Sequence, residues 1–183
     1  MAKGMRQAAE APCSAAGRLV AAEVSEGRSR RHGRAARPRK FGSGCSTVVL
    51  AFGLHQNRAG HLWSVDSEKA WVDATEAALP KDLRPLVTVV HSPVREDDRD
   101  VTGLSHEHVP GISPDFVYLD GPPLTRQRQV AFDVLDLEDR LRPGCLIVID
   151  GRRKNAQYLS RRLTRDYTMT RMVPWRYVFE LRT

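Results

Sequence analysis

Short apolar segments alternate with amphipathic ones between residues 41 and 183, and this alternation limits the possible folds more than any other feature. The expected strands are 61–66, 86–92, 115–123, 144–150, 167–173 and 176–182, and the expected helices are 46–54, 67–79, 125–141 and 152–163. The polar stretch 93–114, with two glycines and three prolines, is expected to be a loop. Strands that alternate with helices predict an α/β fold of the Rossmann-like, doubly wound type, with a mostly parallel sheet.

The net charge of +7 lies in the first 40 residues. Residues 1–40 contain 10 Lys and Arg against 3 Asp and Glu, whereas residues 41–183 contain 19 of each sign. We therefore divide the chain into a basic N-terminal segment, mobile or helical around residues 15–24, and a domain from 41 to 183. Because this domain is neutral, we expect no nucleic-acid partner despite the basic N-terminus.

Cysteine usage and hydropathy predict a cytoplasmic protein. The three cysteines form no CxxC pair, which suits a reducing compartment. The sequence has no run of 18 apolar residues, and its N-terminus lacks the apolar core of a signal peptide, so we expect no membrane partner. Nothing in the sequence indicates the oligomeric state.

Glycines and acids follow the expected strands, at the edge where folds of this type bind ligands. Gly42 and Gly44 permit a tight turn, and the helix that follows presents free N–H groups and the positive end of its dipole. Asp66, 22 residues beyond Gly44, suits the ribose hydroxyls of a ligand or the cap of a helix. Asp120 and Asp150 end two further apolar strands. Each feature alone fits an ordinary turn or cap, but their common register favours a ligand site.

The segments FGSGCSTVVLA, SVDSEKAWVDA, DFVYLDGPP and GCLIVIDGRRKN together resemble the class I S-adenosylmethionine (SAM)-dependent methyltransferases, most closely the small bacterial branch with a GSG-x-ST turn. The resemblance covers residues 41–183 and implies that the last strand is antiparallel. It implies that the turn holds the methionine part of SAM, that Asp66 binds the ribose and that the region of Ser92 flanks the adenine. The cofactor-binding residues implied in this way are Gly42, Ser43, Gly44, Cys45, Ser46, Asp66, Ser67, Ser92 and Asp120.

The resemblance also implies a transfer of the SAM methyl group to a small-molecule acceptor. Because the sulfonium is already activated, catalysis is mainly alignment, with a base where the acceptor must lose a proton. The candidate catalytic residues are Asp120 and His91, ahead of His106 and His108. The sequence has no NPPY or DPPY motif of amino-directed nucleic-acid methyltransferases.

A divalent metal is not expected. Catechol-type O-methyltransferases hold a cation with carboxylates at the positions that Asp120 and Asp150 occupy here. Their pattern has an Asp-Asn pair after the fifth strand, whereas this chain has Asp150-Gly151.

Two other functions fit parts of the pattern. A nicotinamide-dependent Rossmann oxidoreductase would carry a third glycine where Thr47 stands. A non-catalytic binding module on a methyltransferase fold is the second alternative.

The segment before the glycine turn departs from the resembling family. That family usually places Glu or Asp two residues before the first glycine, at the end of an apolar first strand, and this chain has Lys40 preceded by AARPR. Burial of these cations without partners would be unfavourable, and Pro38 lacks an N–H group. We therefore expect the first strand to be atypical or missing. Three explanations are open: the strand is short and divergent, the segment is displaced from the sheet, or residues 1 to about 40 come from an out-of-frame translation. We prefer the third as a hypothesis.

Overall fold

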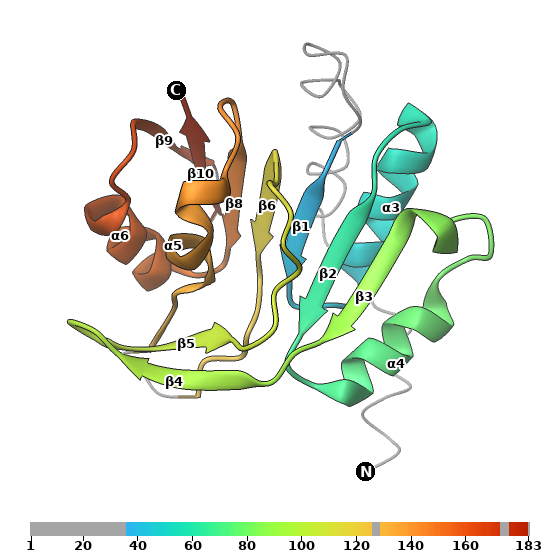
Figure 1. Ribbon diagram of the computed structural model, residues 1–183, viewed down its shortest axis with the longest axis horizontal. Coiled ribbons are helices and arrows are strands. Elements are labelled where there is room, and N and C mark those ends of the chain that lie inside the picture. Colours follow the sequence, from blue (N-terminus) through green and yellow to red (C-terminus); the bar gives the residue numbers. More distant parts are fainter. Residues whose placement is uncertain (1–35, 126–128, 173–175, 183) are drawn as a thin grey trace.

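The computed structural model describes residues 36–125, 129–172 and 176–182, and the helix expected around 15–24 lies outside them. The larger of two sheets has seven strands in the order β3-β2-β1-β6-β8-β10-β9 (Figure 1). Its strands are β1 (Pro38–Phe41), β2 (Leu62–Asp66), β3 (Val87–His91), β6 (Phe116–Leu119), β8 (Leu146–Asp150), β9 (Tyr167–Met172) and β10 (Arg176–Leu181). Strand β10 is antiparallel to both of its neighbours, whereas β3, β2, β1, β6 and β8 are mutually parallel. The predicted Rossmann-like fold is confirmed.

Helices cover both faces of this sheet. Helices α3 (Cys45–Asn57) and α4 (Lys69–Ala78) lie on one face, and α5 (Asp133–Leu137) and α6 (Arg153–Arg162) lie on the other (Figure 1). Alternate strand residues supply the two cores. Residues such as Val117, Ile147 and Ile149 pack towards α5 and α6, whereas Tyr118 and Val148 pack towards α3. None of the described helices combines the length and the apolar character needed to cross a bilayer.

Strand β1 forms at the centre of the sheet as a short strand of atypical composition, so the alternatives in which it is missing or displaced are wrong. It pairs with β2 on one side and β6 on the other, and all four of its side chains are buried. Pro38 is its first residue and pairs only with β6, which is where a strand tolerates proline. The sheet therefore includes Pro38, Arg39 and Lys40, which the sequence analysis placed in the N-terminal segment.

The region 93–114 is the expected loop only over residues 107–114. Its first part forms a hairpin of β4 (Val94–Asp98) and β5 (Thr102–His106), and β7 (Val130–Ala131) joins β5 to complete a three-stranded sheet. The polar composition is misleading because β4 remains mostly exposed while β5 is buried. In Figure 1 this second sheet lies across the end of the large sheet towards which β2 and β3 point.

The expected helix 125–141 is also wrong over most of its described length. Only Asp133–Leu137 is α-helical, and one 3-10 turn (Glu138–Arg140) follows it. The Asn155 side chain accepts the Ala131 N–H (2.6 Å) and donates to the Ala131 carbonyl (3.0 Å). This tertiary contact satisfies the backbone of β7 outside any helix.

The expected strand 86–92 forms as β3, but it is not buried. It lies at the edge of the sheet, and Thr88 and His91 are exposed. Its run of valines suggests a buried strand, but a valine-rich run is equally compatible with a half-covered edge strand.

Candidate functional site

The register of the sheet places the glycine turn between two strand-end acids. Phe41 lies opposite Val65 on β2 and Leu119 on β6. The next residue in each strand is therefore Gly42, Asp66 or Asp120, and these three meet at the carboxyl edge of the sheet. The Gly42 N–H donates to the Val65 carbonyl (2.8 Å), and the Asp120 N–H donates to the Phe41 carbonyl (3.0 Å). The strand order also reverses here, between β1 and β6, which is where open α/β sheets bind ligands.

The turn can be made only with glycine. Gly42 and Gly44 have φ values of 87° and 112°, which side-chain-bearing residues rarely adopt. A Cβ on Gly42 would lie 2.9 Å from the Gly121 nitrogen, and a Cβ on Gly121 would lie 2.5 Å from the Gly42 nitrogen. The turn after β1 and the turn after β6 therefore touch backbone to backbone.

Asp66 ties the glycine turn to the end of β2. Its Oδ2 accepts the Ser43 backbone N–H and the Ser43 hydroxyl (2.7 Å), and its Oδ1 accepts the Glu68 N–H (2.9 Å). Asp66 thus satisfies a backbone N–H at the start of α4, whose N-cap residue, Glu68, makes no capping bond with its own side chain. Ser67 accepts a bond from His91 through its backbone carbonyl (3.1 Å). The carboxylate is almost buried, with 6% of the residue exposed.

Lys40 lies directly beneath the turn and has no exposed surface. Its ammonium donates to the Gly42 carbonyl and lies 5.4 Å from the centre of the Tyr118 ring. Burial lowers the pKa of Lys40 to about 8, although the charges of Asp120 and Asp66 oppose this shift. The sequence singled out Lys40 as an anomaly, but only the structure places its charge at the site.

Asp120 and Asp150 end the neighbouring strands β6 and β8, and both meet cations. The Arg152 guanidinium donates to the Asp120 carbonyl (2.5 Å). Asp150 accepts the Tyr118 hydroxyl (2.6 Å) and lies 3.5 Å from Arg176 Nε. The part of the chain that the structure describes contains no group of three or more His, Cys, Asp or Glu able to hold a metal.

The two candidate bases are far apart. His91 ends β3 and is exposed, and Asp120 follows β6, three strands away in the order β3-β2-β1-β6. Three strand spacings amount to about 14 Å, so the two side chains cannot serve the same acceptor atom. Asp120, beside the glycine turn, is the better placed of the two.

A buried pair of His106 and Asp133 lies on the α5 side of β1, and no sequence motif joins the two residues. Asp133 Oδ1 accepts the His106 backbone N–H (2.9 Å) and lies 3.0 Å from His106 Nδ1. The imidazole stacks on Phe41, with ring centres 5.4 Å apart. His106 Nε2 and Asp133 Oδ2 are buried without a partner among the described residues. The pairing could not be predicted from the sequence, because His106 reaches Asp133 only through strand β5 of the hairpin, and we expected this region to be a loop.

The backbone N–H and the hydroxyl of Ser92 both form hydrogen bonds within the protein. It is fully buried, its N–H donates to the Asp66 carbonyl (2.8 Å), and its hydroxyl accepts the His108 N–H (2.8 Å). Ser92 therefore links β2 and β3 to the segment that follows the hairpin, next to the site.

Replacing Ser92 with alanine is expected to lower the free energy of unfolding by about 1 kcal/mol, because the His108 N–H loses the buried hydroxyl that accepts its hydrogen bond. Urea unfolding of the two proteins measures the change. Ser160→Ala, at an exposed position on α6, should stay within about 0.5 kcal/mol of the parent. An unchanged stability together with weaker binding of S-adenosylhomocysteine (SAH) would point to a ligand contact instead.

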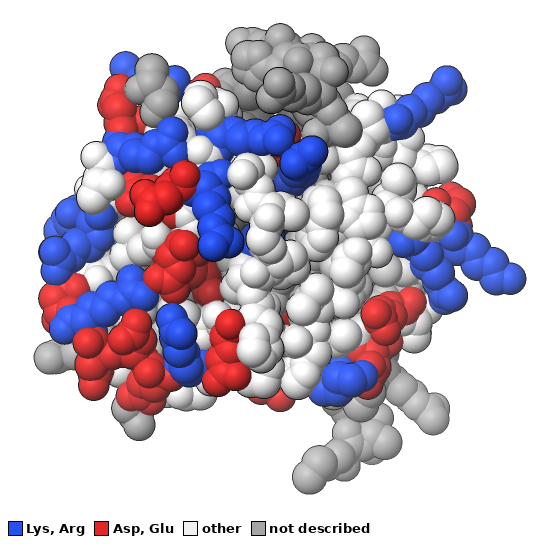
Figure 2. All heavy atoms as spheres, in the orientation of Figure 1, with Lys and Arg blue, Asp and Glu red and all other residues white. Residues whose placement is uncertain are grey.

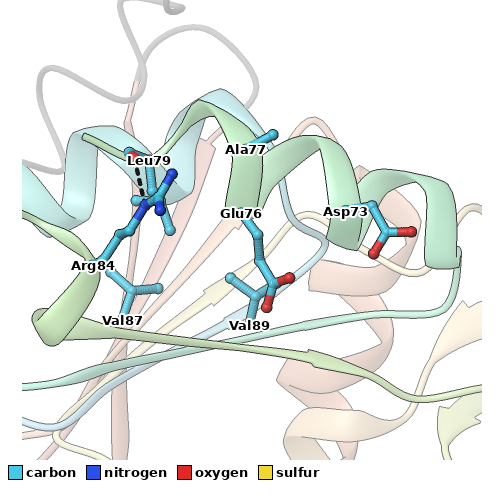
Figure 3. A pocket seen from close by; sticks show the side chains of 7 residues that line it. All are labelled: Asp73, Glu76, Ala77, Leu79, Arg84, Val87 and Val89. Atoms are coloured by element: carbon cyan, nitrogen blue, oxygen red, sulfur yellow. Dashed lines mark hydrogen bonds between the residues drawn. The ribbon is translucent and has the colours of Figure 1, made fainter. Parts of the chain in front are cut away.

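A hollow of about 520 Å³ lies elsewhere, between α4 and the edge strand β3 (Figure 3). Leu79, Val87 and Val89 form its apolar part, with Asp73, Glu76 and Arg84 around them. Arg84 is directed to the Leu79 carbonyl (3.1 Å). None of these residues lies at a strand's carboxyl end, so the hollow is separate from the site at the glycine turn.

Such a sheet, with a glycine turn beside a strand-end carboxylate, defines a Rossmann-like fold of the methyltransferase type. The chain belongs to a family described as methyltransferase domain, which matches residues 40–151. No curated protein matches this chain.

Solved structures share the fold. The O-methyltransferase TomG from Streptomyces achromogenes, involved in tomaymycin synthesis and solved with SAM, is 17% identical over 94% of this chain and 82% of its own, with a TM-score of 0.58. Cofactor-bound Rv0187 from MTB is 15% identical over 94% and 81%, with a TM-score of 0.60. An O-methyltransferase from Bacillus cereus in complex with SAH is 14% identical over 95% and 84%, with a TM-score of 0.58.

Proposed function

We propose that this protein transfers a methyl group from SAM to a small-molecule acceptor. The observation that carries the proposal is the contact of the glycine turn with Asp66 at the carboxyl ends of β1 and β2. Family membership favours methyl transfer over the nicotinamide-dependent alternative. Thr47, where that alternative needs a glycine, is buried and lies 3.0 Å from the Ser64 hydroxyl.

The residues at the turn fit an adenosyl ligand. A carboxylate offers about four acceptor positions, and Asp66 uses three of them in the contacts with Ser43 and Glu68. One of these bonds comes from the Ser43 hydroxyl, which can rotate away. Two acceptor positions are then open, which is the number that the two ribose hydroxyls require.

SAM supplies a methyl group that its sulfonium already activates, so the chain's own residues mainly bind and align. Gly42, Ser43 and Gly44, with Cys45 and Ser46 at the start of α3, would hold the methionine part. Asp66 would hold the ribose. Asp120, exposed beside the turn, would accept the proton of a hydroxyl acceptor.

The surface supports a small acceptor. Figure 2 shows Lys and Arg interspersed with Asp and Glu over the part of this face formed by the hairpin, α5 and α6. A polyanion such as nucleic acid binds best to a continuous basic surface. A hydroxyl-bearing small molecule is the simplest acceptor class, since two of the structural neighbours are named as O-methyltransferases.

Asp66→Asn tests the proposed cofactor site. The parent protein should be stabilised by SAH in a thermal-shift titration, because a ligand that binds only the folded state raises its stability. The amide of the variant would lose the charge-assisted bonds to the ribose, and we expect SAH affinity to fall by at least about tenfold. Asp82→Ala, at an exposed position, should leave the affinity unchanged. Equal SAH affinity in Asp66→Asn and parent, or no binding of SAM or SAH to the parent, would contradict the proposal.

A further inference from the structure

Charges of both signs lie around the glycine turn. The carboxylates of Asp66, Asp120 and Asp150 and the guanidinium of Arg152 all act on the Lys40 ammonium, so three carboxylates face two cations. With the acid that the resembling family usually has in place of Lys40, four carboxylates would face one cation. Lys40 therefore weakens the negative field that would attract a cationic ligand.

The Lys40 charge cannot move away from the turn. The residue has no exposed surface, its ammonium is bonded to the Gly42 carbonyl, and the same ammonium lies over the ring of Tyr118 on β6. The Tyr118 hydroxyl is itself fixed to Asp150 (2.6 Å). Unlike a lysine on the surface, this side chain has no route by which to place its charge in water.

We propose that Lys40 makes the cofactor site discriminate by ligand charge, so that it lowers the affinity for the sulfonium of SAM relative to that for the uncharged thioether of SAH. The inference rests on the proposed function, since it assumes that the turn holds the methionine part of the ligand. SAM and SAH differ by one methyl group and one positive charge, and a buried cation near the turn repels only SAM. A unit charge within about 10 Å, at an effective dielectric constant of about 20, changes affinity roughly tenfold.

Calorimetric titration of SAM and SAH into the parent protein and Lys40→Met measures this discrimination. Methionine keeps an unbranched side chain of similar length and removes the charge. The ratio of the SAM to the SAH dissociation constant should fall by about tenfold in Lys40→Met, with the change mainly in SAM affinity. Lys40→Arg, which keeps the charge, and Lys69→Met, at an exposed position on α4, should keep the parent ratio.

The possible failures are distinguishable. An equal ratio in the parent and Lys40→Met, with both proteins folded by circular dichroism, would overturn the role of Lys40 and leave the proposed function intact. If neither SAM nor SAH binds to the parent or to Lys40→Met, the proposed function itself fails, and with it the inference. If Lys40→Met does not fold, the ratio of the two dissociation constants is measured in the parent, Lys40→Arg and Lys40→Gln. Only the glutamine variant removes the charge, so the ratio should fall in Lys40→Gln alone, and an unchanged ratio there would overturn the role of Lys40.

Discussion

Lys40→Met is expected to raise the free energy of unfolding by about 2–3 kcal/mol at pH 7. The pKa of Lys40 is lowered from 10.5 to about 8 by burial in the central strand. A shift of this size corresponds to about 3 kcal/mol of unfavourable interaction for the charged form. Methionine packs in the same space without a charge, although it gives up the bond to the Gly42 carbonyl.

The gain should depend on pH with a definite sign. Between pH 8 and 10.5 the unfolded chain binds a proton at Lys40 that the folded chain has released, so the stability of the parent rises relative to the variant. Below pH 8 both states are protonated and the full penalty remains. The difference between Lys40→Met and the parent should therefore be largest below pH 8 and fall below about 1 kcal/mol by about pH 10.

Urea unfolding at a series of pH values measures this difference. Subtraction of the parent curve cancels the buried Tyr118 and Cys145, whose pKa values are both raised by burial and which titrate in both proteins. Lys69→Met, at the exposed pair with Asp73, should show less than about 0.5 kcal/mol at every pH. A gain independent of pH would mean that the stabilisation comes from packing and not from the removal of a charge.

Gly121→Ala is expected to lower the free energy of unfolding by about 3 kcal/mol or more and to weaken SAH binding. The new Cβ would lie 2.5 Å from the Gly42 nitrogen and 2.6 Å from the Gly42 Cα. Both are backbone atoms, so no side-chain rotation can relieve the overlap. The turn after β1 must move away from the turn after β6, and this pulls Gly42 from the Val65 carbonyl and Ser43 from Asp66.

Thermal unfolding and SAH titration of Gly121→Ala and Gly111→Ala test this expectation. Gly111 is the matched control, since a Cβ there meets nothing within 4 Å. We expect Gly111→Ala to behave like the parent in both measurements. Normal stability and normal SAH binding in Gly121→Ala would show that the two turns are not in close contact in solution.

The local sequence pattern predicted most strands and helices of the large sheet. Segments such as 144–150 and 46–54 are apolar with the right period, and the structure places β8 and α3 there. The strand-end position of Gly42, Asp66 and Asp120 followed from the same periodicity, because carboxyl ends of parallel strands meet at one edge. The hairpin of β4 and β5 could not be predicted, since its polar residues face solvent and only the fold supplies the surface that buries the other side.

The sequence by itself determined a parallel α/β sheet and a glycine turn with acids at its edge, because apolar periodicity and glycine conformation are properties of short segments. Only the tertiary structure decided that residues 38–41 form the central strand of the sheet. Strands β2 and β6 each present a row of backbone groups to the space between them, and a strand of almost any composition satisfies those groups. Backbone pairing on both sides thus outweighs the unfavourable burial of Arg39 and Lys40. The same pairing places a positive charge under the turn where the resembling family has a carboxylate.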